Sequence, residues 1–174
     1  MLFRSDLLRK PARAPAAWDQ YRRDALNALT GQLVATARKA RPGIVVSAAV
    51  VPDEAQAVYH RYQSWPTWMA DGLLDAVAPM TYTPDTRIFR EQVAQARSHA
   101  RPNQPVWAGI GAYRLPLPSI LEKIQAARES GAAGVVLFSH ESLSLPDLKR
   151  LRDAAFARGV AAAGAPTGVV AGAR

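Results

Sequence analysis

The chain has 174 residues, of which 49% are apolar and 21% are charged, so a packed core is expected rather than disorder. It contains no cysteine, which excludes a disulfide framework, a thiolate metal site and a catalytic thiol. The net charge is +8, but the arginines are scattered over helical segments without interleaved aromatic residues. No nucleic-acid partner is therefore expected.

The N-terminal residues carry no targeting signal that can be recognised. The first ten residues lack the apolar core of a signal peptide, and no stretch approaches the roughly 20 apolar residues of a membrane span. No membrane partner is expected. The location of the protein stays open, because an extracytoplasmic location would require an N-terminal part in front of this sequence.

Apolar residues at helical offsets predict five helices. Arg41-Pro42-Gly43 ends the first, which starts near Trp18, and a capping box at Ser144 and Asp147 opens the last. The other helices are predicted at about 64–71, 86–101 and 118–131. The predicted apolar face of the first helix comprises Leu26, Leu29, Leu33, Val34 and Ala37. Residues 1–17 are predicted to be an irregular lead-in and 159–174 a flexible tail, which leaves 18–158 as the folded domain.

Four short apolar runs alternate with these helices and predict buried parallel strands at 44–51, 76–82, 106–113 and 135–139. Pro79 removes a ladder donor, so the second strand is predicted to bend there. The strands begin near 44, 75, 106 and 135, at intervals of 31, 31 and 29 residues. These intervals match the roughly 31 residues per βα unit of an eight-fold barrel. The sequence thus predicts an α/β fold of four βα units, a partial (β/α)8 TIM barrel.

Six short motifs follow one another along the chain. They are Trp-x-x-Tyr-Arg-Arg (18–23), Val-Ser-Ala-Ala-Val (46–50), Trp68 with Gly72-x-x-Asp75, Ala-Pro-Met-Thr-Tyr (78–82), Gly-Ile-Gly-Ala-Tyr-Arg (109–114) and Gly-x-x-Leu-Phe-Ser (134–139). In this order and spacing they resemble the C-terminal half of the glycosyl hydrolase-like 10 barrel domain. The resemblance covers about residues 18–145 and implies that the four strands are the fifth to eighth of a (β/α)8 barrel in a carbohydrate-directed bacterial protein.

One departure from the family concerns its acidic residues. The family carries them on an Asp-containing motif of strand four, which would precede Trp18, and the residues before Trp18 show no such motif. The resemblance therefore implies that the general acid lies outside this chain, through a split or truncated gene or a start site assigned too late. A half-barrel is expected to need an N-terminal half-barrel or to self-associate, because it leaves edge strands unpaired.

The candidate site follows from the barrel rule that function lies at the C-terminal ends of the strands. Tyr82 and Arg114 can bond sugar hydroxyls or a carboxylate, with a barrel-mouth tyrosine and a rim salt bridge as the structural alternatives. Trp65, in the long loop after the first strand, is the preferred stacking platform; Trp107 and Trp68 are expected in the core. The full set of strand-end residues is Ser47, Ala49, Met80, Tyr82, Tyr113, Arg114, Ser139, His140 and Glu141.

Carboxylates decide whether hydrolysis is feasible, because the usual route needs two of them. Asp53, Glu54, Asp85 and Glu141 follow strand ends, and of these Glu141 alone is retained as a catalytic candidate, with helix capping or a surface pair as the alternative. The three histidines have no metal-ligand spacing, and no Gly-rich phosphate turn is present, so no metal and no cofactor are expected.

Two functions therefore stay open. The first is a fragment of a glycoside hydrolase-like protein acting on a polysaccharide or cell-wall glycan, inactive when isolated. The second is a non-catalytic carbohydrate-binding or degenerate barrel fragment. A metabolic barrel that binds a phosphorylated substrate is disfavoured, since Glu141 would repel phosphate after the last strand.

Overall fold

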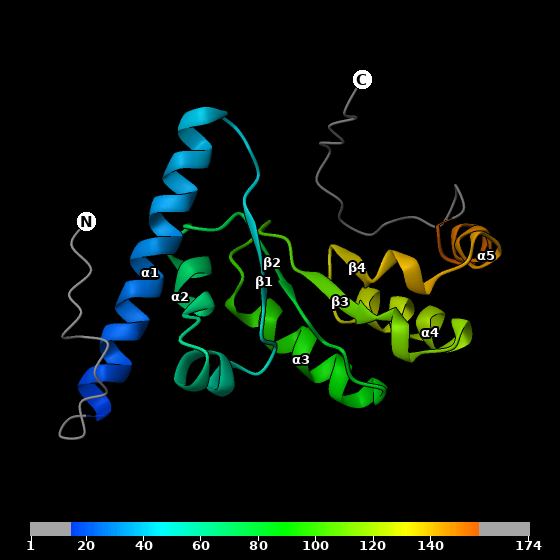
Figure 1. Ribbon diagram of the computed structural model, residues 1–174. Coiled ribbons are helices and arrows are strands. Elements are labelled where there is room, and N and C mark those ends of the chain that lie inside the picture. The colour runs from blue at the N-terminus through cyan, green and yellow to red at the C-terminus, as the bar shows by residue number, and fades with distance from the viewer. Residues whose placement is uncertain (1–14, 157–174) are drawn as a thin grey trace.

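The computed structural model describes residues 15–156 as a mixed α/β fold with short parallel strands. Helices and strands alternate along this part of the chain, as predicted (Figure 1). The elements are α1 (Pro15–Ala40), β1 (Ser47–Val50), η2 (Gln56–His60), α2 (Trp65–Ala70), β2 (Ala76–Pro79), α3 (Thr86–His99), β3 (Trp107–Gly111), η3 (Ala112–Arg114), α4 (Leu117–Glu129), β4 (Gly134–Phe138), η4 (His140–Ser142) and α5 (Leu145–Ala155).

The four strands lie side by side in sequence order. β1 pairs with β2 and β3 with β4, all in parallel, and the bridge between Val77 and Val106 joins the two pairs. The register places Ala49 beside Ala78, and Trp107 beside Gly134. Sequential parallel neighbours joined by helices are the arrangement of repeated βα units.

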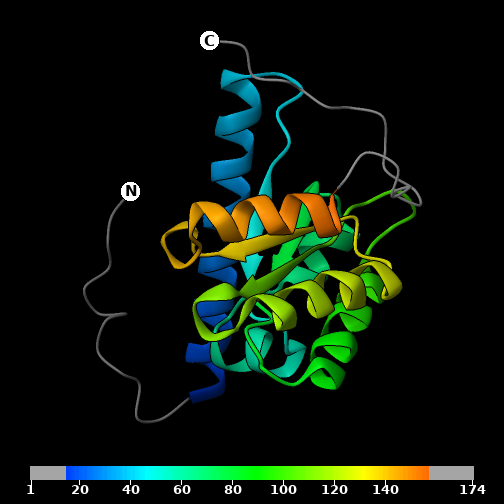
Figure 2. The ribbon, with the colours of Figure 1, turned by 90° about the vertical axis from the view of Figure 1, so that its right-hand side faces the viewer.

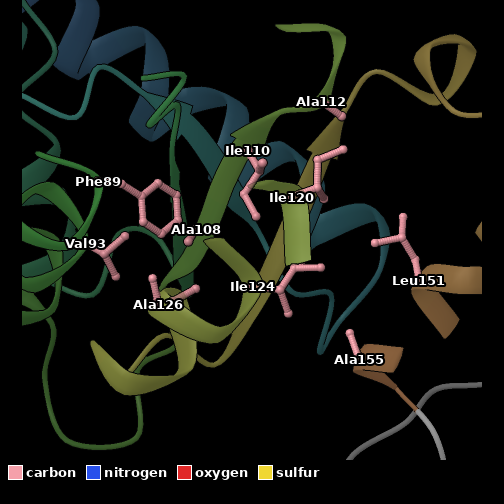
Figure 3. Close-up of a cluster of buried hydrophobic side chains, with 11 residues drawn as sticks. Phe89, Val93, Ala108, Ile110, Ala112, Ile120, Ile124, Ala126, Leu151 and Ala155 are labelled. Carbon is pink, nitrogen blue, oxygen red and sulfur yellow. The ribbon is translucent and has the colours of Figure 1, made fainter. Parts of the chain in front are cut away.

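Two apolar clusters cover one face of the strands. One lies between β3 and the helices α3, α4 and α5 (Figure 3), and its buried residues are Phe89, Val93, Ala108, Ile110, Ala112, Ile120, Ile124, Ala126, Ala127, Leu151 and Ala155. Figure 2 shows α4 and α5 side by side next to β4. The other joins α1 and α2 to β1 and β2, with Trp65, Met69 and Val77 fully buried. Every second strand residue therefore faces the helices.

The first helix differs from its prediction at both its start and its apolar face. It begins at Pro15, so 15–17 are helical; the rest of the predicted lead-in and the predicted tail lie outside the described residues. Val34 is buried and Leu26 packs against the core, but Leu29 and Leu33 are 50% and 62% exposed. The predicted face was too wide, because apolar offsets do not show where the neighbouring element lies.

Strand ends and helix caps follow local chemistry. β2 ends at Pro79, which has no N–H to donate, although the N–H of Met80 still donates to the carbonyl of Val50 at 2.9 Å. Ala112–Arg114 forms a 3₁₀ turn rather than the predicted end of β3. The predicted capping box of Ser144 and Asp147 opens α5. Ser64 precedes α2 as predicted, but its side chain makes no capping hydrogen bond. Among residues 15–156, no helix combines the length and the apolar character that a bilayer crossing requires.

Gly109 fixes how closely β2 and β3 approach. A Cβ atom at this position would lie 2.6 Å from the carbonyl oxygen of Pro79 and 3.2 Å from the Cα of Met80. Backbone atoms cannot turn aside as a flexible side chain can, so the two strands can be this close only where residue 109 is glycine.

We expect Gly109→Ala to lower the free energy of unfolding by about 1–3 kcal/mol, the cost typical of overpacking. Gly31→Ala is the matched control, because Gly31 lies within α1 and nothing surrounds its Cβ position within 4 Å. That change should raise stability by about 0.5–1 kcal/mol through helix propensity. Urea titration followed by circular dichroism measures both, and equal effects of the two substitutions would contradict the close-approach role of Gly109.

Candidate functional site

Three aromatic rings meet at the C-terminal ends of β2, β3 and β4. The rings of Tyr82 and Phe138 stack at 5.5 Å between centroids and 13° between planes. Tyr113 meets both edge-on, 6.3 Å from Tyr82 and 5.9 Å from Phe138. Such offset-stacked and T-shaped geometries are the favoured ones for aromatic pairs. We call Tyr82, Tyr113 and Phe138 the aromatic cluster.

A glycine makes the aromatic cluster possible. Gly111 pairs with Phe138 across β3 and β4, and a Cβ atom on it would lie 3.1 Å from the Cβ of Tyr82. Because residue 111 has no side chain, the rings from β2 and β4 reach each other over β3. The buried hydroxyl of Thr81 donates to the carbonyl of Gly109 at 2.5 Å and fastens the end of β2 to β3.

The cluster keeps one accessible side. Phe138 is 51% and Tyr113 46% exposed, while Tyr82 is half-buried. The guanidinium of Arg114 lies 5.0 Å from the ring centroid of Tyr113, and among the described residues it forms no ion pair. The site thus combines exposed aromatic surface with a cation free to bond an anionic or hydroxyl-rich ligand.

Burial, with a smaller contribution from Tyr113, raises the pKa of the Tyr82 phenol above its ordinary value. The hydroxyl of Tyr82 makes no hydrogen bond within residues 15–156. It therefore remains a protonated, unengaged donor at neutral pH, able to bond a ligand oxygen.

Glu141 lies in η4, just beyond β4, and is exposed. The hydroxyl of Ser139 donates to its carboxylate at 2.7 Å, and this bond, helped by the backbone N–H of Glu141, lowers the pKa of the carboxyl group. A group held ionised in this way suits a base or a nucleophile better than a general acid.

The other carboxylates at strand ends have structural partners. Asp85 caps α3 by accepting from the N–H groups of Arg87 and Ile88, and these bonds help to lower its pKa. Asp53 accepts from Gln56, and Glu54 pairs with His99 at 2.9 Å. None of the three is free for chemistry, and the part of the chain that the structure describes has no metal-binding group of histidines and carboxylates.

The structure brings together some of the predicted site residues and separates others. Tyr82, Tyr113 and Arg114 form one surface, and the half-buried Met80 follows β2 next to Gly109. Ser47 and Ala49 lie on β1, on the face away from the helices, and His140 is exposed beside Glu141. The prediction for Trp65 as a platform was wrong, because its ring is completely buried and its indole N–H donates to Val51.

Phe138 was not among the residues predicted for the site. The sequence contains a usable signal, since Phe138 is the last residue of an apolar strand, as Tyr82 is of the predicted strand 76–82. The prediction passed over it in favour of the polar residues that follow, whereas an exposed ring at a strand end is itself a binding feature.

Comparison with known families yields a match over much of the chain. The model of the glycosyl hydrolase-like 10 family matches residues 3–126, more than half of the chain. The chain belongs to the glycosyl hydrolase-like 10 family. The match begins ahead of Trp18, where the recognised motifs start, and it ends before β4. Neither the curated proteins nor the solved structures contain a match.

The raised pKa of Tyr82 is measurable by its ultraviolet absorbance. In a spectrophotometric titration, Tyr82→Phe should remove one tyrosine that ionises above the ordinary tyrosine range near pH 10. Since the folded pKa exceeds the unfolded one, this tyrosine contributes stability that is lost as the pH rises through the folded pKa. An unchanged late-titrating component in Tyr82→Phe would contradict the burial of this phenol.

Proposed function

We propose that the described residues form the last four βα units of a (β/α)8 barrel. Four parallel strands in sequence order, separated by helices on one face, support this proposal together with the family membership. On this proposal the C-terminal ends of the strands form part of the barrel mouth.

The proposed activity of this mouth is carbohydrate binding, as part of a glycoside hydrolase-like protein acting on a polysaccharide or cell-wall glycan. The observation that carries the proposal is the aromatic cluster with Arg114 beside it, at the strand ends of a glycosyl hydrolase-like chain. Exposed ring faces suit the apolar faces of sugars, and the Tyr82 hydroxyl and Arg114 suit their oxygen atoms.

Hydrolysis by the usual route requires a protonated carboxyl group as well as an ionised one. Glu141 would provide the ionised group, and the proton donor would come from the remaining units of the barrel. The chain described here would then bind and orient the glycan without completing the reaction alone.

A non-catalytic carbohydrate-binding barrel is the second candidate. The contact of Glu141 with Ser139 favours it, since that carboxylate is already engaged within its own turn. The two candidates share the same binding surface and differ only in whether turnover follows.

A binding experiment tests the carbohydrate-binding surface that the two candidate functions share. Arg114→Ala and Tyr82→Phe should each weaken the affinity for soluble glycan oligosaccharides by about 2- to 10-fold, the value of one hydrogen bond, while the melting temperature stays nearly constant. Tyr59→Phe is the matched control, because Tyr59 is 65% exposed on η2, outside the aromatic cluster. Isothermal titration calorimetry gives the affinities. A large loss of stability with unchanged affinity would assign Tyr82 and Arg114 to structure.

A turnover assay tests what both candidates imply, namely that the isolated chain does not complete hydrolysis. We expect the purified chain to release no reducing ends from a panel of polysaccharides and peptidoglycan, because one ionised carboxylate cannot act as both acid and base. Robust turnover that Glu141→Gln abolishes would disprove this expectation and make Glu141 the catalytic residue of a self-sufficient site.

A further inference from the structure

A second group of aromatic residues lies at the start of α1, apart from the aromatic cluster. It is built from the Trp-x-x-Tyr-Arg-Arg motif (18–23). The rings of Trp18 and Tyr21 stack at 5.4 Å between centroids and 14° between planes. The guanidinium of Arg22 lies 5.5 Å from the ring centroid of Trp18 and 4.2 Å from that of Tyr62. Such cation–π contacts hold the rings in place. We call Trp18, Tyr21, Arg22 and Tyr62 the α1 patch.

The α1 patch is fastened to the segment that follows β1. The Tyr62 hydroxyl donates to Oδ1 of Asp19 at 3.1 Å, and Arg22 donates to the same oxygen at 2.5 Å. Arg23 adds a hydrogen bond of 2.7 Å to the carbonyl of Val58. Tyr62 has a φ of 60°, a left-handed conformation that is costly for a bulky side chain. Strained residues of this kind persist where the surrounding contacts enforce them, and they are concentrated at binding sites.

The α1 patch presents one aromatic ring to the solvent. Tyr21 is 44% exposed, and because Trp18 covers one face of its ring, the exposure falls on the other face and the ring edge. Gln20 and Asp24 flank Tyr21 along α1 and are both exposed. The amide of Gln20 donates to the carboxylate of Asp24 at 2.8 Å. A flat apolar ring thus lies beside two planar polar groups that already orient each other.

The charges of this surface favour an uncharged ligand. Residues 15–24 contain two aspartates and two arginines, which balance. Both arginines are already engaged, Arg22 with Asp19 and Arg23 with the Val58 carbonyl. An anionic polymer such as a nucleic acid depends on cations that contact its phosphates. A sugar does not, because it offers an apolar face for stacking and hydroxyl groups for hydrogen bonds.

The α1 patch lies on the same side of the molecule as the aromatic cluster. Arg38, near the end of α1, pairs with Asp75 at the start of β2, whereas the start of α1 contacts the segment after β1. Both surfaces therefore lie toward the C-terminal ends of the strands. Figure 1 shows α1 at one end of the row of strands and β4 near the other. Three strand spacings of about 4.8 Å separate β1 from β4, so a ligand that reaches both surfaces must span on the order of 15 Å or more.

We propose that the α1 patch is a second sugar-binding site, which holds the outer part of a long glycan whose other part lies at the aromatic cluster. Tyr21 provides the stacking face, and Gln20 and Asp24 bond hydroxyl groups of the same sugar. Arg22 and Tyr62 keep the stacked rings in position. The inference rests on the carbohydrate binding of the proposed function and adds a second contact surface and a preference for polymers. Two linked contacts give one ligand a higher overall affinity than either contact alone.

Isothermal titration calorimetry tests the preference for polymers. The probes are two soluble polysaccharides, glycol chitin and hydroxyethyl cellulose, and the disaccharides chitobiose and cellobiose. Tyr21→Ala should weaken the affinity for a bound polymer by roughly 2- to 10-fold, the value of one aromatic stacking contact. The affinity for the disaccharide, which cannot span both surfaces, should change by less than two-fold. Tyr21→Phe keeps the ring and should leave polymer binding within two-fold, as should Leu29→Ala, the matched control at a 50% exposed position further along α1.

Tryptophan fluorescence provides a second measurement that does not require a change at Tyr21. Trp65 and Trp68 are buried, and Trp107 begins β3, at the end of the strands away from the aromatic cluster. Trp18 is therefore the tryptophan placed to report on the α1 patch. A saturating polymer should change the emission spectrum, and Trp18→Phe should remove that change. An emission change that persists in Trp18→Phe would count against binding at the α1 patch.

The variants separate this inference from the proposed function. Polymer binding that Tyr82→Phe and Arg114→Ala weaken but Tyr21→Ala does not would overturn the α1 patch and leave the proposed function intact. Polymer binding that only Tyr21→Ala weakens would overturn the aromatic cluster as the sugar-binding surface and retain the α1 patch. If neither polymer bound, both proposals would be overturned.

Discussion

The close contact between β2 and β3 is the constraint on which the rest of the described structure depends. Gly109 and Gly111 allow the carbonyl of Pro79 and the ring of Tyr82 to lie directly against β3. The regular pairing of these strands is limited to the bridge between Val77 and Val106, so this contact, with the Thr81 hydroxyl, joins the two strand pairs. The same glycines let Tyr82 stack on Phe138. One backbone feature thus supports both the sheet and the candidate site.

The helices and strands could be predicted because their signals are local. Apolar periodicity, prolines and glycines predicted every long helix and every strand. The capping chemistry of Ser144 and Asp147 predicted the start of α5. Errors arose where a distant neighbour decides the outcome. Leu29 and Leu33 have the same helical spacing as Val34, yet only Val34 meets another element. Trp65 occurs in a polar stretch that looks like a surface loop, and α2 turns its ring into the core.

The candidate site could be predicted only as far as the ends of the strands could be predicted. Placing Tyr82, Tyr113 and Arg114 at neighbouring strand ends required only the order of the strands, and the structure brings the three side chains together. Phe138 was missed because the polar residues that follow β4 were preferred to the ring at its end, although only the contact over Gly111 shows that this ring meets Tyr82. The lowered pKa of Glu141 could not be predicted from the sequence either, because it depends on the orientation of the Ser139 hydroxyl.

The candidate site and the strand order are linked through the proposed barrel. The aromatic cluster occupies the ends of β2, β3 and β4, so in a (β/α)8 barrel it would form one wall of the mouth, and the remaining units would form the opposite wall. A glycan that touched both walls would have more contacts in the closed barrel than on these four units alone, and it would therefore stabilise the closed form by mass action. The contact of β2 with β3 at Gly109 and Gly111 would then support the sheet and this wall of the mouth together.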